Sequence, residues 1–453
     1  MLDVCDRAEI GSICKEKDFD LKIITKKANS LVKDYKIHYD PLSIVPSDNS
    51  MADSVFDAGF QLALETGLFC KDTQRIIKFS EEELKEAIKS APDMLDLGEG
   101  KDKVTMKFRG IESDIKPIIA GGGAGMLVSE DVYVKLLATF IKDPIIDTFG
   151  GSHALRKVYG RLLTPKSPLE VLLVKREAQL VKEALTMVGR PGMHVIMGGG
   201  GSTALGAIAG YSTEGGLRRT DGLLIAILPE LKTDYIRLSM AIHQSSYGGI
   251  AISLIEPIIG YAGGPEVSAI IGVAAILLST LAYGVKYHLF GPVNLKYPAS
   301  TTNRECLWVE NIVGQAISRK TRMLITNNII ACSGPCTEQV LYETAAACIG
   351  NVPSGWHMGP GVGASSTKIE NGGTGLETKF MAECSLASIG LSRDEANKLV
   401  DKFLAKVEPY FKNPLVGKTF LDCYDIEKLE PTYEWLEIYK KVKKEVEDFG
   451  LKF

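Results

Sequence analysis

Eight short apolar runs, most of them ended by glycine, proline or a polar cluster, constrain the fold of this 453-residue chain more than any other feature. They begin about 25 to 50 residues apart, and the intervals often carry a helical pattern, as in residues 168–188. Buried strands that alternate with helices form parallel sheets joined by crossovers. Eight such units predict an α/β fold of the closed (β/α)8 TIM-barrel type, with an open doubly wound sheet as the alternative. The runs are Pro117–Ala120, Ile145–Phe149, His194–Met197, Leu223–Leu228, Ile250–Ile255, His288–Val293, Met323–Thr326 and, weakly, Trp356–Gly359.

Helical patterns flank these runs on both sides. Ser80 with Glu83 and Ser392 with Glu395 have the spacing of capping boxes, which start helices. We therefore expect three regions: an N-terminal helical extension (residues 1–110), the TIM barrel (111–390) and C-terminal helices packed on the barrel (391–453).

The charge and the cysteine content limit the possible binding partners and cellular compartments of the protein. The net charge of −4 gives no electrostatic basis for binding nucleic acid. Nine scattered cysteines, an odd number, argue against a disulfide framework and for a reducing compartment. The opening residues "MLDVCDRAEIG" lack the apolar core of a signal peptide. We expect a cytoplasmic protein.

The uncharged segment Val267–Val285 is long enough to cross a bilayer as a helix. It is single, it contains small polar residues, and no aromatic belt flanks it. We expect no membrane insertion, and a helix buried between the barrel and a neighbouring subunit.

The glycine run Gly198–Gly201 follows one of the apolar runs and suggests two roles. It lacks the Gly-Lys-Ser/Thr of a P-loop, so a nest of amides for phosphate is the weaker interpretation. The other is a slot left by a bulky group that this chain no longer carries. No histidine pair has metal-ligand spacing, and Cys332 and Cys336 have no second cysteine pair, so we expect no metal site.

Seven motifs together resemble the monomethylamine:corrinoid methyltransferases of methylotrophic archaea, and the likeness runs over the whole chain. They are "GRPGMHV" (189–195), "GYAGG" (260–264), "HLFGPVNL" (288–295), "STTNREC" (300–306), "CSGPCTE" (332–338), "GGTGLETKFMAE" (372–383) and "GKTFLDCYD" (417–425). The resemblance implies a TIM barrel, a homo-oligomer (a hexamer in the known type), and methyl transfer to Co(I) on a partner corrinoid protein. The cobalamin-ligand motif Asp-x-His-x-x-Gly is absent here, so the corrinoid must come on that partner.

The resemblance also implies a departure at the catalytic position. Family members carry pyrrolysine, an electrophile that captures an amine, after the "RPGM-x-V" run, and here that position falls on Ile196. The family's pocket Gln and Tyr fall on Asn328 and Ile330, and Glu256 is the nearest candidate for its pocket carboxylate. Isoleucine offers no electrophile, so monomethylamine is not the expected donor.

A quaternary amine or another activated methyl compound remains a suitable donor, because its leaving group departs as a neutral molecule. A quaternary cation is usually held by aromatic faces and a carboxylate. We therefore expect Glu256 as counter-charge, and His153 as a group that polarises the substrate. The candidate aromatic residues are Phe149, Tyr247, Tyr261 and Trp356. The alternative function is a non-catalytic barrel that binds a methylated ligand or a corrinoid protein.

Overall fold

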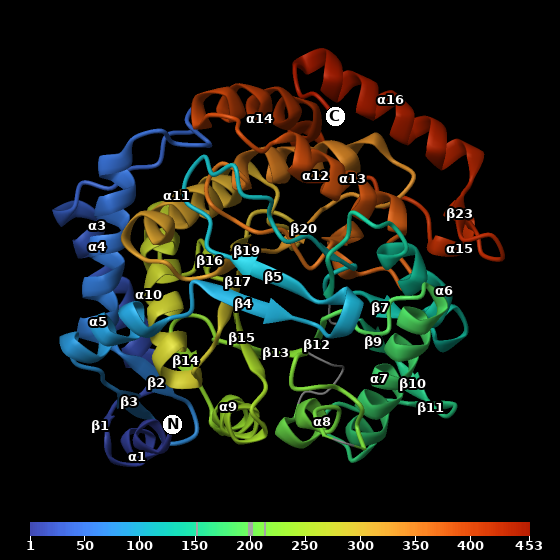
Figure 1. The fold of residues 1–453 in the computed structure, drawn as a ribbon. Helices are drawn as coiled ribbons and strands as arrows, with labels where there is room; N and C mark the ends of the chain where they lie inside the picture. The colour runs from blue at the N-terminus through green and yellow to red at the C-terminus, as the bar shows by residue number, and fades with distance from the viewer. Residues whose placement is uncertain (151–152, 198–202, 213) are drawn as a thin grey trace.

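The computed structural model describes residues 1–150, 153–197, 203–212 and 214–453. Seven parallel strands form one curved sheet in the order β19-β17-β15-β13-β12-β8-β6 (Figure 1). The eighth strand closes the barrel, because His357 bridges Thr326 of β19 and Met358 bridges Ile119 beside β6, both in parallel. The predicted TIM barrel is therefore confirmed, and the open sheet is excluded. The seven strands are β6 (Ala120–Gly121), β8 (Thr148–Gly150), β12 (Val195–Met197), β13 (Gly222–Ala226), β15 (Ile250–Ile255), β17 (Tyr287–Phe290) and β19 (Ile325–Asn327).

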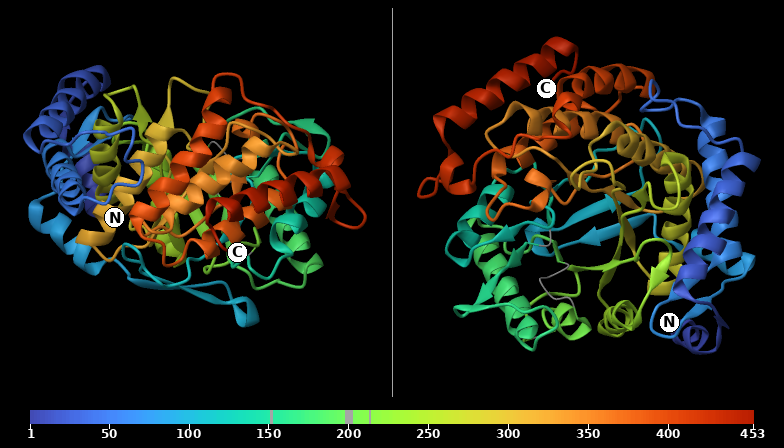
Figure 2. Two further views of the ribbon diagram at one scale, coloured as in Figure 1. Left: turned by 90° about the horizontal axis from the view of Figure 1, so that it is seen from above. Right: turned by 180° about the vertical axis from the view of Figure 1, so that it is seen from behind.

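A helix follows each barrel strand and covers the outside of the sheet (Figures 1 and 2). The strands carry apolar side chains on both faces because one face lines the barrel interior and the other contacts these helices. In chain order the helices are α6 (Glu130–Ile141), α7 (Leu169–Met187), α8 (Ala204–Ile208), α9 (Tyr235–Tyr247), α10 (Pro265–Tyr283), α11 (Arg304–Lys320), α12 (Glu338–Asn351) and α13 (Gly375–Ala387).

A hairpin of β4 (Met94–Leu97) and β5 (Val104–Lys107) closes the end of the barrel where the strands begin. Leu97 and Met106 of this hairpin belong to the apolar cluster of the barrel interior, together with Ile250 and Leu324. The hairpin projects at one edge of the molecule in Figure 2. In the described part of the chain the hairpin covers this end, so the opposite end, where the strands finish, is the entrance that a ligand can use.

The N-terminal extension is less helical than we expected. Its helices are α1 (Leu2–Ile10), α2 (Glu16–Asp18), the π-helix η1 (Phe19–Ile24), α3 (Thr25–Asp34), α4 (Asn49–Thr66), α5 (Glu81–Ser90) and the 3-10 helix η2 (Gly100–Asp102). Helix α5 begins at the predicted capping box of Ser80. It also contains β1 (Ser12–Ile13), β2 (Leu68–Cys70) and β3 (Arg75–Ile77), and β2 pairs with β14 (Lys232–Thr233) of the barrel. This pairing ties the extension to the loop that follows β13.

Helix α10 contains most of the uncharged segment. We expected a neighbouring subunit to bury one side of this helix, and the structure corrects that expectation. The chain's own α4 and α11 pack on it (Figure 1). In the part of the chain that the structure describes, α10 is the one helix long and apolar enough to cross a membrane, and 83% of its most apolar window is buried. Pro265 occupies its first turn, and Gly284 ends it in the left-handed conformation.

The C-terminal region consists mainly of helices. Helix α14 (Arg393–Val407) begins at the Ser392–Glu395 capping box, and α16 (Tyr433–Phe449) ends at Gly450. Between them lie α15 (Phe420–Cys423) and the pair β22 (Tyr424–Asp425) and β23 (Glu430–Pro431). Both long helices pack on α12, so this region adds an outer layer to the barrel (Figure 1).

Candidate functional site

A cavity of about 310 Å³ opens at the carboxyl ends of the barrel strands. In TIM barrels this is the end at which active sites form, because the loops after the strands converge there. Most of its lining is aliphatic, with one carboxyl and one amide among it. The lining residues are Ala124, Gly125, Leu224, Leu254, Glu256, Leu289, Asn328, Ile330, Pro360 and Thr367.

Glu256 and Asn328 form the polar part of this cavity. Glu256 follows β15 and Asn328 follows β19, and Asn328 Nδ2 donates to Glu256 Oε1 at 3.2 Å. Burial raises the pKa of Glu256 to about 7, although the hydrogen bond from Asn328 favours the ionised form. Among the described residues, the buried Oδ1 of Asn328 has no hydrogen-bond partner. The pair therefore offers a ligand a titratable carboxyl and an available acceptor.

Glycine at position 291 is required for this arrangement. A Cβ atom there would lie 2.9 Å from the Cβ of Asn328 and 3.0 Å from its carbonyl oxygen. Gly291 follows β17, which lies between β15 and β19 in the sheet. Its missing side chain lets the backbone carrying Asn328 pass close to the end of β17, within reach of Glu256.

Ile196 and Ile330, the two predicted aliphatic replacements, lie at different depths. Ile330 lines the cavity beside Asn328. Ile196 is 4% exposed and belongs to the apolar cluster of the barrel interior, together with the cavity-lining residues Leu224 and Leu289. The side chain of Ile196 thus faces the barrel interior and contributes no polar or electrophilic group there. The glycine run and its proposed slot, residues 198–201, lie outside the described residues.

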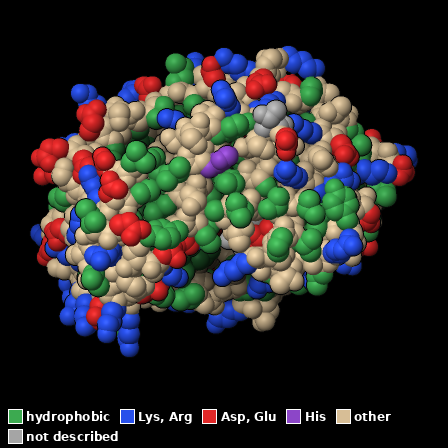
Figure 3. Space-filling view, turned by 90° about the horizontal axis from the view of Figure 1, so that it is seen from below, with side chains coloured by type: hydrophobic (Ala, Val, Ile, Leu, Met, Phe, Trp, Pro, Cys, Tyr) green, Lys and Arg blue, Asp and Glu red, His purple; other side chains and the backbone are tan. Residues whose placement is uncertain are grey.

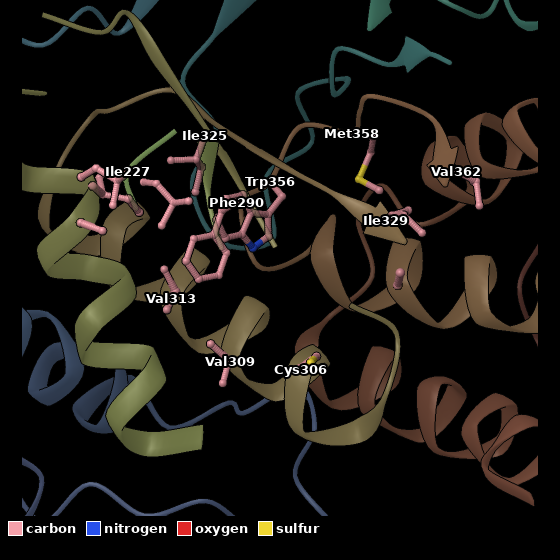
Figure 4. Close-up of a cluster of buried hydrophobic side chains, with 14 of the residues drawn as sticks. Ile227, Phe290, Cys306, Val309, Val313, Ile325, Ile329, Trp356, Met358 and Val362 are labelled. Atoms are coloured by element: carbon pink, nitrogen blue, oxygen red, sulfur yellow. The ribbon is translucent and has the colours of Figure 1, made fainter. Parts of the chain in front are cut away.

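The predicted aromatic cage is wrong, because the described lining of the cavity contains no aromatic side chain. Trp356 is fully buried outside the barrel interior, where it stacks on Phe290 at 5.5 Å and donates Nε1–H to the carbonyl of Glu310 (Figure 4). Tyr247 of α9 stacks on His243 at 5.8 Å and donates its hydroxyl to the carbonyl of Leu217.

The other two aromatic candidates are also engaged elsewhere. Tyr261 is half exposed and donates its hydroxyl to Asp20 of the N-terminal extension at 3.0 Å. Phe149 is buried and stacks on His153 at 5.3 Å. Because these two residues lie near the ends of strands, we expected their side chains to line the cavity. Each of them instead packs against neighbouring elements of the fold.

His153 does not line the cavity, and this corrects its expected role as a polarising group. It is 2% exposed, between the rings of Phe140 and Phe149. Its Nε2 accepts a hydrogen bond from the backbone N–H of Gly123 at 2.9 Å. His153 thereby holds the loop that leads to the cavity residues Ala124 and Gly125.

Glu230 is a second buried acid near the cavity that sequence reasoning missed. It follows β13 and is 2% exposed, and burial raises its pKa to about 7. Glu230 and Glu256 line one small space between the ends of β13 and β15, and Glu230 accepts a hydrogen bond from the N–H of Ile258 at 2.9 Å. The sequence did contain a signal for Glu230, namely an acid within a few residues of the end of a predicted strand. The nearby Lys232, however, makes this segment resemble a solvent-exposed turn.

Metal ligands do not gather at this site. In the described ranges, no group of three or more histidine, cysteine or acidic side chains is placed to hold a metal ion. All nine cysteines are free thiols. The chemistry that these residues support is the binding of a small, mostly apolar molecule beside one carboxyl.

Comparisons with known proteins agree over the whole length. The family model for monomethylamine methyltransferase MtmB matches residues 1–451. The curated monomethylamine methyltransferase MtmB2 of Methanosarcina barkeri (strain Fusaro) is 36% identical over 454 residues, covering 100% of this chain and 98% of the relative. MtmB of Methanosarcina mazei is 34% identical with the same coverage.

Solved structures show the same architecture. The crystal structure of the Methanosarcina barkeri monomethylamine methyltransferase superposes with a TM-score of 0.96 at 35% identity, covering 100% of this chain and 98% of that one. A hydroxylamine complex of that enzyme superposes equally well.

The closed barrel, together with the family match and these relatives, places the chain among TIM-barrel methyltransferases. The chain belongs to the monomethylamine methyltransferase family MtmB.

Proposed function

We propose that this chain transfers a methyl group from a small methylated donor to the Co(I) corrinoid of a partner protein, without pyrrolysine. The Glu256–Asn328 pair in an aliphatic cavity at the open end of the barrel carries the proposal. The corrinoid is a second substrate, delivered by its own protein to this open end. The relatives are named for monomethylamine; the donor of this chain is proposed to be a more activated methyl compound.

The chemistry follows from what the lining supplies. Co(I) attacks the methyl carbon in line, the carbon–nitrogen pair stays on nitrogen, and a quaternary ammonium leaves as a neutral amine. The protein then has to orient the donor and balance its charge. Ionised Glu256 supplies the opposite charge, and the aliphatic walls exclude water from the methyl group. Ile196 can form no adduct with the donor, so the donor must react without covalent activation.

Because no aromatic side chain lines the described cavity, a donor must be recognised by other groups. Recognition of a cation here depends on the Glu256 carboxylate and on the available Oδ1 of Asn328. Since a carboxylate holds any small methylated cation, the class of donor is broader than a quaternary amine bound by aromatic faces.

A donor screen tests this function. Reduced corrinoid protein is mixed with the chain and with tetramethylammonium, trimethylamine, dimethylamine or monomethylamine, and conversion of Co(I) to methyl-Co(III) is followed by absorbance. We expect a signal with an activated donor, little with monomethylamine, and at least a tenfold loss in the Glu256→Gln variant, because removing one partner of a buried charge pair costs about 2–5 kcal/mol. A robust rate with monomethylamine would overturn the proposed donor class. Binding of a donor with no methylation would favour the non-catalytic barrel.

We also propose a homo-oligomer in the cytoplasm. Hydrophobic side chains gather among charged groups on the face formed by α1, α8 and α9 (Figure 3). Leu205 of α8 is 71% exposed and Ile242 of α9 is 39% exposed. Exposed apolar groups that lie together favour association. Light scattering of the purified chain measures the molar mass, and a mass of 49.2 kDa would exclude the oligomer.

A further inference from the structure

We propose that the hairpin β10–β11, at the rim of the barrel mouth, is a docking element for an acidic surface of the partner that carries the corrinoid. The hairpin consists of β10 (Lys157–Val158) and β11 (Arg161–Leu162), joined by the turn Tyr159–Gly160. That the bound protein is the corrinoid carrier rests on the proposed function. That its contacting surface is acidic follows from the charge of the hairpin.

The hairpin is connected to the cavity through the strand β9 that precedes it. The neighbouring strand β9 (Ala154–Leu155) pairs in parallel with β7 (Leu127–Val128), and the two lie next to each other in Figure 1. The N–H of Ala154 donates to the carbonyl of Met126, which follows the cavity residues Ala124 and Gly125. A protein that brings its corrinoid to a methyl group in this cavity must therefore cover the rim on which the hairpin stands.

The charge of the hairpin is of one sign. Residues 153–169 contain four cations and no acid, in a chain whose net charge is −4. Among the described residues, none of these cations has an ion-pair partner at 4.0 Å or less, whereas just over half of the other lysines and arginines are paired with acids. Unpaired cations of one sign steer an acidic partner and reject a basic one. The four are Arg156, Lys157, Arg161 and Lys166.

The tip of the hairpin carries an aromatic residue in an unfavourable conformation. Tyr159 and Gly160 both have positive φ, 47° and 76°, as a two-residue turn of type I′ requires. Asparagine or glycine suits the first position of this turn, whereas a bulky tyrosine is strained there. Tyr159 is nevertheless 61% exposed, and Leu162 beside it is 60% exposed. Exposed tyrosine flanked by arginine is typical of interface anchors.

The alternative occupant, a nucleic acid, is disfavoured by the size of the patch. Two cations on a short hairpin, with Arg156 and Lys166 beside it in the sequence, cannot follow a phosphate backbone over several turns. A protein surface with a few carboxylates and one pocket for Tyr159 fits the hairpin in size and charge.

Direct binding tests the inference without any methyl donor. The probe is the fluorescently labelled corrinoid protein of a Methanosarcina monomethylamine methyltransferase, titrated with the full chain at two salt concentrations. We expect Lys157→Glu/Arg161→Glu to weaken binding at least tenfold at low salt and to reduce the salt dependence of Kd. Tyr159→Asn should weaken binding about fivefold or more while leaving the urea midpoint unchanged or higher, because asparagine relieves the strained turn.

Matched changes elsewhere serve as controls. Lys440→Glu/Lys444→Glu and Tyr433→Asn place the same substitutions on exposed positions of α16, and both should bind like the wild type. Wild-type binding by the hairpin variants, or heparin competing as well as an excess of unlabelled corrinoid protein, would overturn the inference. If hairpin-dependent binding is found but no donor gives methylation, the docking surface stands and the proposed reaction fails.

Discussion

Asn328 Nδ2 donates to Glu256 Oε1 at 3.2 Å, although 72 residues separate the two along the chain. The contact joins the ends of β15 and β19, two strands that flank β17 in the barrel. It couples the charge of the cavity to one amide, because the hydrogen bond favours the ionised carboxyl while burial favours the neutral one.

Donor binding should depend on pH through Glu256. Its pKa of about 7 leaves the carboxyl mostly neutral at pH 6 and mostly ionised at pH 8, so the affinity for a cationic donor should rise about tenfold over this range. Isothermal titration with tetramethylammonium measures this rise. The Glu256→Gln variant should bind weakly and equally at both pH values; a variant that keeps the wild-type pH dependence would assign the titration to another group, with Glu230 the next to test.

Glu256 should also make the stability of the fold depend on pH. Because its folded pKa is raised above the ordinary value of 4.5, the neutral carboxyl stabilises the fold at low pH. That contribution is lost as the pH rises from about 4.5 through 7. Relative to Glu256→Gln, the wild type should therefore lose at least about 1 kcal/mol of unfolding free energy between pH 5 and pH 8, one pKa unit being worth 1.36 kcal/mol. Urea unfolding at both pH values measures it, and a constant difference would contradict the expectation.

Removing the amide should shift the titration upward. In Asn328→Leu the carboxyl loses the donor that favours its charge, so the pKa of Glu256 should rise further, by roughly half a unit or more. The midpoint of the pH profile of methyl transfer, or of donor binding, reports the shift. Asn328→Gln, which can still donate, is the matched control and should return the midpoint toward that of the wild type.

Cavity size should select the donor. Ile330 lines the cavity of about 310 Å³, and Ile330→Phe adds a ring that fills part of it. We expect kcat/KM for a large methylated cation to fall at least tenfold while that for a small one changes little, since steric exclusion costs more as the donor grows. Equal losses for both donors would place Ile330 away from the bound donor.

Gly150 should be intolerant of a side chain. A Cβ there would lie 2.6 Å from the Cβ of Pro360 and 3.2 Å from Cδ1 of Ile196. Gly150→Ala should therefore cost roughly 1–3 kcal/mol of unfolding free energy through overpacking. In Gly110→Ala the new Cβ meets no atom within 4 Å, so this control should be neutral in urea unfolding.

The sequence by itself determined the barrel and its helical flanks, because these depend on local patterns. An apolar run such as Ile250–Ile255 bounded by turn residues predicts a buried strand, and it became β15 with those bounds. The Ser80–Glu83 and Ser392–Glu395 capping boxes fixed helix starts through contacts three residues apart. The motifs likewise identified the family, and the resemblance to that family singled out both Glu256 and Asn328.

Only the tertiary structure decided which side chains meet in the cavity. The packing of Trp356 on Phe290, of Tyr261 against Asp20 and of His153 beneath Gly123 depends on rotamers and on neighbours distant in the chain. The cover of α10 by α4 and the burial of Glu230 have the same origin. Residue type and spacing specify an element and its apolar faces, but burial and hydrogen-bond partners are set by the elements that fold against it, and these come from all parts of the chain.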